Sequence, residues 1–455
     1  MRQDAFGGLY VGTTNLLRLL SQAITDPRPR LRLAQLGIGM LTSGGGPLTH
    51  AIGSTAKDWS ADYRLFSKTD WQEDDLFRPI IRECVTGAER MVFAAQDDFI
   101  AHKSSRKIAT YARDPLGPKF RPNFVLAQRF TATSLLLRPP GGTGQWRSVP
   151  VACEYTPPVP KAGKKADAEE IRAVRERRKK QNVSVTAGNR VNKLRAELDA
   201  LPGGRKLKLV AVTDGGFANK TYLGVLPERT TSIQRFRRDA LLRELLPESR
   251  RTGNAKYGRK LETPEQYLNN KDVPFTTARI RAGKHQLDIR FKVRHGIAWQ
   301  AGTGDRQVTV VSLAPTPYRM SKNGRVYYRQ PAFLIVAGEL AETAMDEATL
   351  IRLIEAYFAR FEIEVNFRDL KTGLGLGEAQ VSNPQSIRRA PAFMAACYSC
   401  LLLASIQCSN DLRTPQGYIH LPPWRRKGEN RRPSINDLIT RLKAEAQAWE
   451  VLQAA

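Results

Sequence analysis

Hydrophobic positions in the first part of the chain follow a helical rhythm. Leu16 to Leu20 is rich in leucine at helical spacing, and a second apolar segment runs from Leu31 to Leu41. A glycine-rich turn, Gly44 to Gly46, then interrupts the pattern. Short helices broken by such a turn are compatible with a DNA-binding helix-turn-helix, and equally with an ordinary helical cap. We therefore predict a helical region over residues 1–85, with DNA binding as one hypothesis for it.

The pattern changes to strands after residue 90. Met91 to Ala95 is a continuous apolar run followed closely by Asp97 and Asp98, and a later apolar run, Leu207 to Val212, is followed by Asp214. Short apolar runs that end in polar or turn residues are typical of buried strands. The intervening pattern predicts the order strand, strand, strand, helix, strand over residues 91–95, 123–137, 146–155, 166–201 and 206–213.

The second half of the chain predicts an insertion and then a return to the core. Alternating apolar and polar residues, dense in Arg and Lys, indicate β-strands over 253–330. A strand over 331–337, a helix over 346–370 and an apolar helix from Pro391 follow. We predict an α/β fold in which helices flank a mixed sheet. Its parts are a helical region 1–85, a core in two parts, 86–252 and 331–410, a β-rich insertion 253–330, and a tail 411–455 that holds the basic residues 425–427 and a final helix 434–449.

Charge indicates a polyanionic partner. The 455 residues include 72 Lys and Arg against 44 Asp and Glu, a formal net charge of +28. Such a field favours nucleic acid. The basic run Arg172 to Lys180 is either a solvated helical face or a surface that follows phosphates. No stretch approaching the roughly 20 apolar residues of a membrane span stands out, so we expect no membrane partner.

The cysteines and the N-terminus bear on the compartment. The five cysteines are odd in number and scattered, which favours a reducing environment over a disulfide framework. Cys397 and Cys400 lack further ligands at zinc spacing and are expected to be buried helical thiols. The start at Met1 lacks the long apolar segment of a signal peptide. We therefore expect the protein in the cytoplasm.

The acids at the strand ends suggest metal-dependent chemistry on phosphate esters. In-line displacement at phosphorus uses two divalent cations roughly 3.5–4 Å apart, and hard cations take carboxylate oxygens. Asp97 and Asp214 each follow an apolar strand, where a rigid sheet can hold a carboxylate toward a shared site. The alternatives are a strand-end turn for Asp97 or Asp98 and a helix cap for Asp214.

A third acid comes from the segment 357–371. On a continuous helix Arg360 lies four residues before Glu364, while Tyr357 and Lys371 lie seven residues to either side, offset by about 40° and 20° around the axis. We therefore expect the four side chains on one stripe, with a carboxylate for metal beside cations for phosphate. The alternative is a surface acid paired with Arg360 or Arg368.

The spacing Tyr, two residues, Arg, three residues, Glu, six residues, Lys over 357–371 resembles the signature of bacterial insertion-sequence DDE transposases. The segment from Asp214 to Asn219 resembles the second-aspartate region of that family, and the basic segment 234–239 follows it. The first-aspartate region, 94–99, is similar except that Phe99 stands where a Thr or Ser is common. The stretch 63–71 resembles a region that precedes the catalytic domain in some members.

The resemblance implies a DDE transposase with a ribonuclease H-like catalytic core, which would cleave transposon ends and transfer a freed 3′-hydroxyl into target DNA. It implies a catalytic and metal-binding triad of Asp97, Asp214 and Glu364, with two Mg²⁺ ions or possible Mn²⁺. Tyr357, Arg360 and Lys371 would contact end phosphates. Its partners would be double-stranded transposon-end and target DNA, bound by a homodimer at the bacterial nucleoid.

Two further functions remain open from the sequence. A nuclease or resolvase with the same core would cut without joining strands, and a transposase derivative without activity would only bind DNA. Asp98 competes with Asp97 as first acid. Three other acids near the motifs are held in reserve: Asp239, Glu248 and Glu362. His102 and Lys103 follow the first acid and are expected at the surface, with contact to the substrate as the alternative.

The third acid gives the first testable prediction. Glu364→Gln removes a carboxylate charge with little change of shape, and is therefore expected to abolish metal-dependent DNA cleavage while DNA-end binding persists. Cleavage assays and gel-shift assays on the same preparation measure the two quantities. Cleavage retained by the variant would remove Glu364 from the triad.

Overall fold

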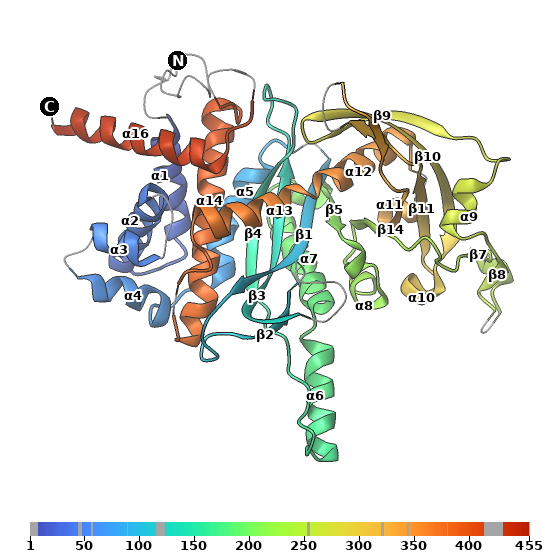
Figure 1. Cartoon of the computed structure of the whole chain (residues 1–455), viewed down its shortest axis with the longest axis horizontal. Helices are drawn as coiled ribbons and strands as arrows, with labels where there is room; N and C mark the ends of the chain where they lie inside the picture. Colours follow the sequence, from blue (N-terminus) through green and yellow to red (C-terminus); the bar gives the residue numbers. More distant parts are fainter. Residues whose placement is uncertain are drawn as a thin grey trace. The chain divides into compact units, whose positions relative to one another are not determined.

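The computed structural model describes most of the chain. The described residues are 8–43, 48–55, 58–88, 90–114, 123–252, 255–319, 323–343, 345–379, 381–413 and 431–454. The predicted glycine turn at 44–46 and the basic residues 425–427 lie outside this set. The predicted α/β class is confirmed, because parallel and antiparallel strands form mixed sheet structure that helices flank (Figure 1).

The chain divides into two compact units. Unit 1 comprises Met1–Gly87, Asp98–Val183 and Glu362–Ala455, and unit 2 comprises Ala88–Asp97 and Ser184–Phe361. Strand β1 (Met91–His102) gives its first part to unit 2 and its last part to unit 1. Asp97 and Asp98 therefore belong to different units although they are neighbours in sequence.

Unit 1 is built around one long buried helix, α14 (Pro384–Ser409). Asn383 caps it through its side-chain oxygen, which accepts from the backbone N–H groups of Gln385 and Ser386, and the helix ends at Asn410 in a left-handed conformation. The helices expected over residues 1–85 form and pack on or near α14: α1 (Gly8–Ser21), α2 (Pro27–Ser43), α3 (Leu48–Thr55), α4 (Trp59–Ser67) and α5 (Glu73–Val85). The final helix is α16 (Ile435–Ala454).

Helix α14 corrects one expectation. No membrane-length apolar stretch was anticipated, yet this 26-residue helix is long and apolar enough to cross a membrane. Its most apolar window is 83% buried inside the protein, as in the central helix of a soluble domain. Cys397 and Cys400 lie on it, both fully buried, and burial raises the pKa of each thiol. The expectation of buried helical thiols is confirmed.

The strands of unit 1 centre on β3. β3 (Phe124–Leu137) pairs antiparallel with β2 (Thr110–Arg113) and β4 (Arg147–Tyr155), and α14 packs on β4. β2 was not anticipated from the sequence, whereas β3 and β4 match the expected segments closely. Helix α6 (Ala168–Lys180) and helix α13 (Glu362–Arg368), which leads into the π-helical turn η4 (Asp369–Gly373), complete the unit.

Unit 2 carries strands in the order β1, β5, β6, β14, β11, β10, β7, β8. The first three run parallel, and the remaining pairs with printed register are antiparallel. The bounds of these strands are β5 (Lys208–Thr213), β6 (Thr230–Arg235), β7 (Arg243–Leu245), β8 (Tyr257–Lys260), β10 (His285–Ala298), β11 (Gln307–Leu313) and β14 (Ala332–Gly338). In addition, β9 (Thr276–Ala282) pairs with β10. A separate pair consists of β12 (Pro317–Arg319) and β13 (Val326–Tyr328). The β-rich character expected for 253–330 is therefore present.

Helices connect these strands. The main ones are α7 (Val183–Asp199), which begins at the unit boundary, and α12 (Glu347–Ala359). The short ones are η1 (Gly204–Lys206), η2 (Gly215–Phe217), α8 (Lys220–Leu223), η3 (Glu248–Arg250), α9 (Pro264–Asn269), α10 (Gln300–Thr303) and α11 (Glu339–Glu342).

The continuous helix expected over 346–370 is wrong in detail. α12 ends at Ala359, a turn spans Arg360 and Phe361, and α13 begins at Glu362. Arg360 remains right-handed, and its N–H is shared between the carbonyls of Ala356 and Tyr357, which tightens the last turn. Residues share one stripe of a helix only where the helix is continuous. The break therefore removes the reason to expect Tyr357, Arg360, Glu364 and Lys371 on a single stripe.

A buried ion pair gives a test of unit 1. Nε and Nη2 of Arg147 on β4 donate to the two carboxylate oxygens of Asp411 after α14, at 2.8 and 2.7 Å, and the two side chains are only 3% and 4% exposed. Asp411→Asn leaves the buried guanidinium uncompensated, so we expect it to lower the free energy of unfolding by about 3–5 kcal/mol.

Chemical denaturation followed by circular dichroism measures that change. The matched control is Asp288→Asn, which breaks the exposed pair with Arg279 and should cost less than about 1 kcal/mol. Equal effects in the two variants would show that the buried pair has no special role.

Candidate active site

Two carboxylates lie on adjacent parallel strands of unit 2, with Asp97 inside β1 and Asp214 directly after β5. β1 pairs with β5 in unbroken register from Met91 with Lys208 to Gln96 with Thr213. Leu209, Val210, Ala211 and Val212 of β5 are fully buried. Asp97 and Asp214 directly follow the last registered pair, so they lie side by side at the point where β5 ends and β1 continues to His102.

A buried polar network fixes β1 beside Asp97. The Gln96 side chain is 0% exposed; its amide donates to the carbonyl of Ala187 on α7 at 3.1 Å, and its oxygen accepts from the Tyr222 hydroxyl at 2.7 Å. Burial raises the pKa of Tyr222, so the phenol stays a donor. Both kinds of amide atom are therefore hydrogen-bonded, and the residue before Asp97 has a defined position.

The turn after Asp214 is held against β6. The Phe217 N–H donates to the Asp214 carbonyl, and the buried Gln234 amide donates to the Phe217 carbonyl at 3.3 Å. A side chain on Gly215 would bring its Cβ within 3.3 Å of the Arg235 carbonyl oxygen, which shows how closely the turn fits. Asp214 occupies the cap position of η2, yet its side chain makes no capping hydrogen bond. The helix-cap alternative for its carboxylate is therefore not supported.

Arg360 joins the acids from the end of α12. Its guanidinium donates to Asp97 Oδ2 at 2.8 Å, with 14% of the Arg360 side chain and 21% of the Asp97 side chain exposed. α12 contacts β5, β6 and β9, with Leu353 and Ile354 fully buried. The Glu355 carboxylate also accepts from the Arg281 N–H of β9. The sheet therefore fixes the position of the helix that carries Arg360.

Tyr357 lies one turn before Arg360 and completes the cluster in unit 2. Burial raises the pKa of Tyr357, the Asp214 carboxylate also raises it, and Arg360 and Arg235 oppose both. Asp214, Arg360 and Arg235 therefore all lie within electrostatic range of the Tyr357 hydroxyl. Arg235, at the end of β6, was not singled out individually from the sequence, although it belongs to the basic segment noted after Asp214.

Asp98 has different surroundings from Asp97. Successive strand side chains point to opposite faces. Burial raises the pKa of Asp98, and Arg129 of β3 opposes this, whereas Asp97 pairs with Arg360. In unit 1 the Phe99 ring packs on Phe130 and Phe367 at centroid distances of 5.3 and 4.5 Å. Phe99 is thus a core residue.

Glu364 and Lys371 belong to unit 1. Neighbouring residues anchor α13: the Asn366 amide donates to the hydroxyls of Ser134 and Ser148, and Phe367 packs on Phe99. Glu364 is partly exposed. The Lys371 ammonium lies 5.4 Å from the centre of the Phe99 ring; burial lowers the pKa of Lys371 and the Asp114 carboxylate opposes this.

The π-helical turn that carries Lys371 has its own anchor. Its first residue, Asp369, is 3% exposed and accepts from the Tyr398 hydroxyl at 2.9 Å. Its last hydrogen bond runs from the Leu374 N–H to the Asp369 carbonyl. Such turns shift the angular position of the residues that follow them. Lys371 therefore cannot be aligned with Glu364 by counting helical residues.

The reserve acids have other partners. Glu362 is buried and accepts from Arg432, and Asp239 pairs with Arg237 at the surface. Glu248 is exposed. His102 is exposed as expected and lies near Asp114.

Lys103 differs from the expectation of a surface residue. Its side chain is buried, and its ammonium donates to the carbonyls of Gly377 and Ala379, both at 2.6 Å. Two carbonyl acceptors allow the ammonium to be buried, a requirement that is not visible from sequence spacing.

The cluster in unit 2 suits a hard cation and phosphate together. Asp97 and Asp214 supply carboxylate oxygens, which Mg²⁺ prefers, and Arg360, Arg235 and Tyr357 supply donors for phosphate. Within the described ranges, no group of three or more His, Cys, Asp and Glu residues could hold a metal ion. The two strand-end acids are thus a partial donor set.

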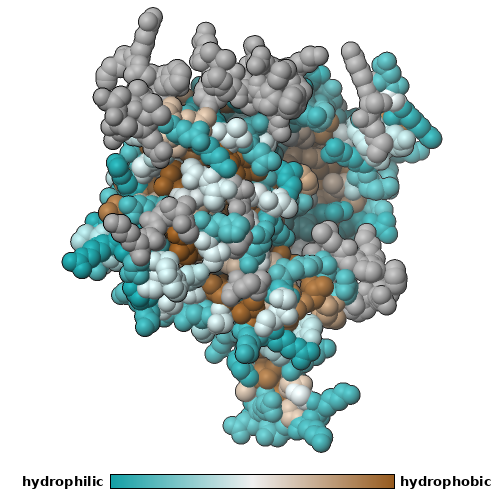
Figure 2. Space-filling model, turned by 60° about the vertical axis from the view of Figure 1, so that its left-hand side comes forward, coloured by the Kyte–Doolittle hydropathy of each residue, from teal (hydrophilic) through white to brown (hydrophobic). Residues whose placement is uncertain are grey.

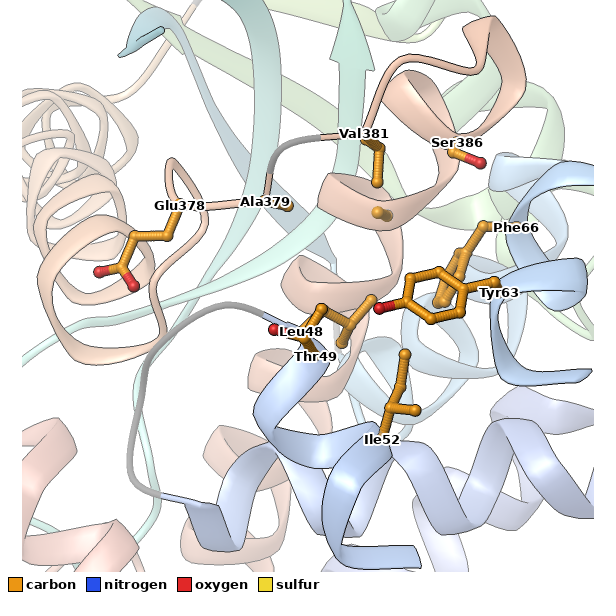
Figure 3. Close-up of a pocket in the computed structure, with 10 residues that line it drawn as sticks. Leu48, Thr49, Ile52, Tyr63, Phe66, Glu378, Ala379, Val381 and Ser386 are labelled. Carbon is orange, nitrogen blue, oxygen red and sulfur yellow. The ribbon is translucent and has the colours of Figure 1, made fainter. Parts of the chain in front are cut away.

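Unit 1 has a separate, apolar pocket of about 310 Å³. Leu48 and Ile52 of α3, Tyr63 and Phe66 of α4, and part of α14 line it, and Figure 3 shows these four side chains beside one another, with Glu378 pointing elsewhere. None of the predicted site residues lines this pocket, which therefore has no part in the acid cluster.

The Gln96 network gives a test of how the site is held. Tyr222→Phe removes one hydroxyl and leaves the buried Gln96 oxygen without that donor, so we expect the free energy of unfolding to fall by about 1–3 kcal/mol. Tyr328→Phe, at a side chain 65% exposed, is the control and should change stability little. Chemical denaturation measures the free energy of unfolding of both variants. An unchanged value for Tyr222→Phe would show that the hydrogen bond to Gln96 does not stabilise the fold.

No protein-family profile matches the chain, and no curated protein aligns with it significantly.

Proposed function

We propose that this protein is a DDE transposase that cleaves transposon ends and transfers the freed 3′-hydroxyl into target DNA. The observation that carries the proposal is the pairing of β1 with β5, which sets Asp97 and Asp214 side by side with Arg360 on Asp97. Arg360 and Tyr357 come from the same segment whose spacing resembles the family signature. The register supplies the two aspartates, and one residue of the motif, Arg360, contacts the first of them.

Each residue of the cluster has a role in this proposal. Mg²⁺ or Mn²⁺, two ions in all, would activate the attacking oxygen and stabilise the leaving oxygen. Asp97, Asp214 and Glu364 are the proposed ligands, and Arg360 holds the Asp97 carboxylate in one orientation. Tyr357, Arg360 and Lys371 are the proposed contacts to end phosphates, to which Arg235 is added because of its closeness to Tyr357.

The rest of the proposal concerns fold, partners and place. Three parallel strands, β1, β5 and β6, of which the first two carry the aspartates, are compatible with a ribonuclease H-like core. The net charge of +28 supports double-stranded DNA as partner. By resemblance, the protein acts as a homodimer on paired ends, in the bacterial cytoplasm at the nucleoid. The helical region 1–85 remains the proposed DNA-binding region.

Substitutions of the two aspartates test the proposal against a control one residue away from Asp97. Asp97→Asn and Asp214→Asn remove metal ligands, so each is expected to reduce Mg²⁺-dependent DNA cleavage by at least a hundredfold. Asp98→Asn alters a carboxylate in different surroundings and should retain most activity. The substrates are duplexes with the sequences that flank the coding region in its genome. Full activity of Asp97→Asn combined with loss in Asp98→Asn would transfer the role to Asp98.

The products of the same reaction separate the alternatives. A transposase yields strands joined to a second, unlabelled duplex, whereas a nuclease or resolvase with the same core yields nicks alone. Denaturing gels resolve the two. DNA binding without any cleavage under Mg²⁺ or Mn²⁺ would identify a derivative that has lost catalysis.

A further inference from the structure

Helix α6 is exposed along nearly its whole length. Of the 13 residues of Ala168–Lys180, only Val174 is buried. Figure 1 shows α6 extending away from the strands of its own unit, and the lower projection in Figure 2, where α6 lies, is mostly hydrophilic. The helix therefore has almost no apolar contact to hold it in place.

Such a helix is unstable without other support. Isolated helices shorter than roughly 12–15 residues are marginal in water, and most helical stability in proteins comes from burying an apolar face. α6 has its N-cap, where Asp167 accepts from the Glu170 N–H at 2.7 Å, and a pair between Lys179 and Glu176. These contribute only about 1 kcal/mol each or less. A binding partner would supply the missing stabilisation.

The charges on α6 are segregated along its axis. Glu169 and Glu170 occupy the first turn, and the last turn holds the four cations of residues 177–180. The remaining acid, Glu176, accepts a hydrogen bond from Lys179. This bond and the charges of Lys179, Lys180 and Arg175 lower the pKa of the Glu176 carboxyl. The far part of the helix is therefore strongly cationic, and these cations also suit its C-terminal dipole.

A cationic hollow lies along this helix. It has a volume of about 520 Å³ and lies between the connector before α6 and the helix itself. Its charged lining residues are Lys161, Arg175, Arg178 and Lys179, and no acidic residue is among the described residues that line it. Two separate segments thus present cations to one space.

We propose that α6 and Lys161 form a binding surface for the phosphate backbone of duplex DNA, distinct from the acid cluster. The identification of the bound polyanion as DNA rests on the proposed function. An α-helix is about 10–12 Å wide and fits a major groove about 12 Å across, where guanidinium and ammonium groups reach the flanking phosphates. The exposed helix lacks the apolar face with which an amphipathic helix enters a lipid surface.

Neutralising the hollow tests the surface. In the full-length chain, Lys161→Gln, Arg175→Gln and Arg178→Gln together remove three cations while keeping good helix formers. Binding of a labelled duplex of unrelated sequence is measured by fluorescence anisotropy from about 50 to 200 mM salt, in chelator. We expect the variant to bind more weakly. The slope of log affinity plotted against log salt concentration should become less steep by about 2.7, which is about 0.9 for each lost phosphate contact.

Two controls interpret the result. Arg237→Gln, Arg259→Gln and Arg279→Gln remove the same charge from exposed cations that are each paired with an acid, and should leave the slope nearly unchanged. Lys161→Arg, Arg175→Lys and Arg178→Lys keep the charge and should retain the wild-type slope, which excludes misfolding as the cause. An equal loss in both neutralised variants, or a loss confined to duplex RNA or to anionic lipid vesicles, overturns the proposal.

The assay is independent of catalysis because it contains no divalent ion. A failure of the cleavage tests therefore leaves the α6 surface intact. Conversely, normal DNA binding by the α6 variant in a chain that cleaves DNA would refute this surface alone.

Discussion

The candidate site depends on the register between β1 and β5. Side chains in a strand alternate between faces, so a slip of one residue would turn Asp97 away from Asp214 and bury the wrong positions. The apolar residues that precede the acids fix that register, since Leu209 to Val212 have no exposure to water. Burial of the strands and placement of the two carboxylates are therefore one constraint.

Polar groups near this edge fall into two kinds. Gln96 and Gln234 are fully buried, and the side-chain nitrogen of each donates to a backbone carbonyl, which ties the backbone around the acids to neighbouring elements. Asp97, Asp214 and Tyr357 lie one step further out, with partial exposure, where a substrate can reach them. The interior groups set geometry, and the outer groups remain available for chemistry.

The sequence was sufficient for the parts of the site that depend on local pattern. An apolar run followed by an acid identified β1 and β5, because burial of a parallel strand requires such a run. It was insufficient where tertiary contacts decide. The break at Arg360 and Phe361, the π turn anchored through Asp369 and Tyr398, and the burial of Lys103 by two carbonyls each require a partner that is distant in sequence. Whether Glu364 joins the two aspartates remains a prediction from the motif.

The division of the chain has a consequence for synthesis on the ribosome. The chain passes from one unit to the other at residues 87/88, 97/98, 183/184 and 361/362. All of unit 2 has been translated once Phe361 is made, whereas unit 1 still lacks α14, its central helix. The helices of residues 8–85 must therefore wait, with their apolar faces uncovered, until the last fifth of the chain emerges. Nascent chains that stall before α14 would expose this surface and would depend on chaperones for their solubility.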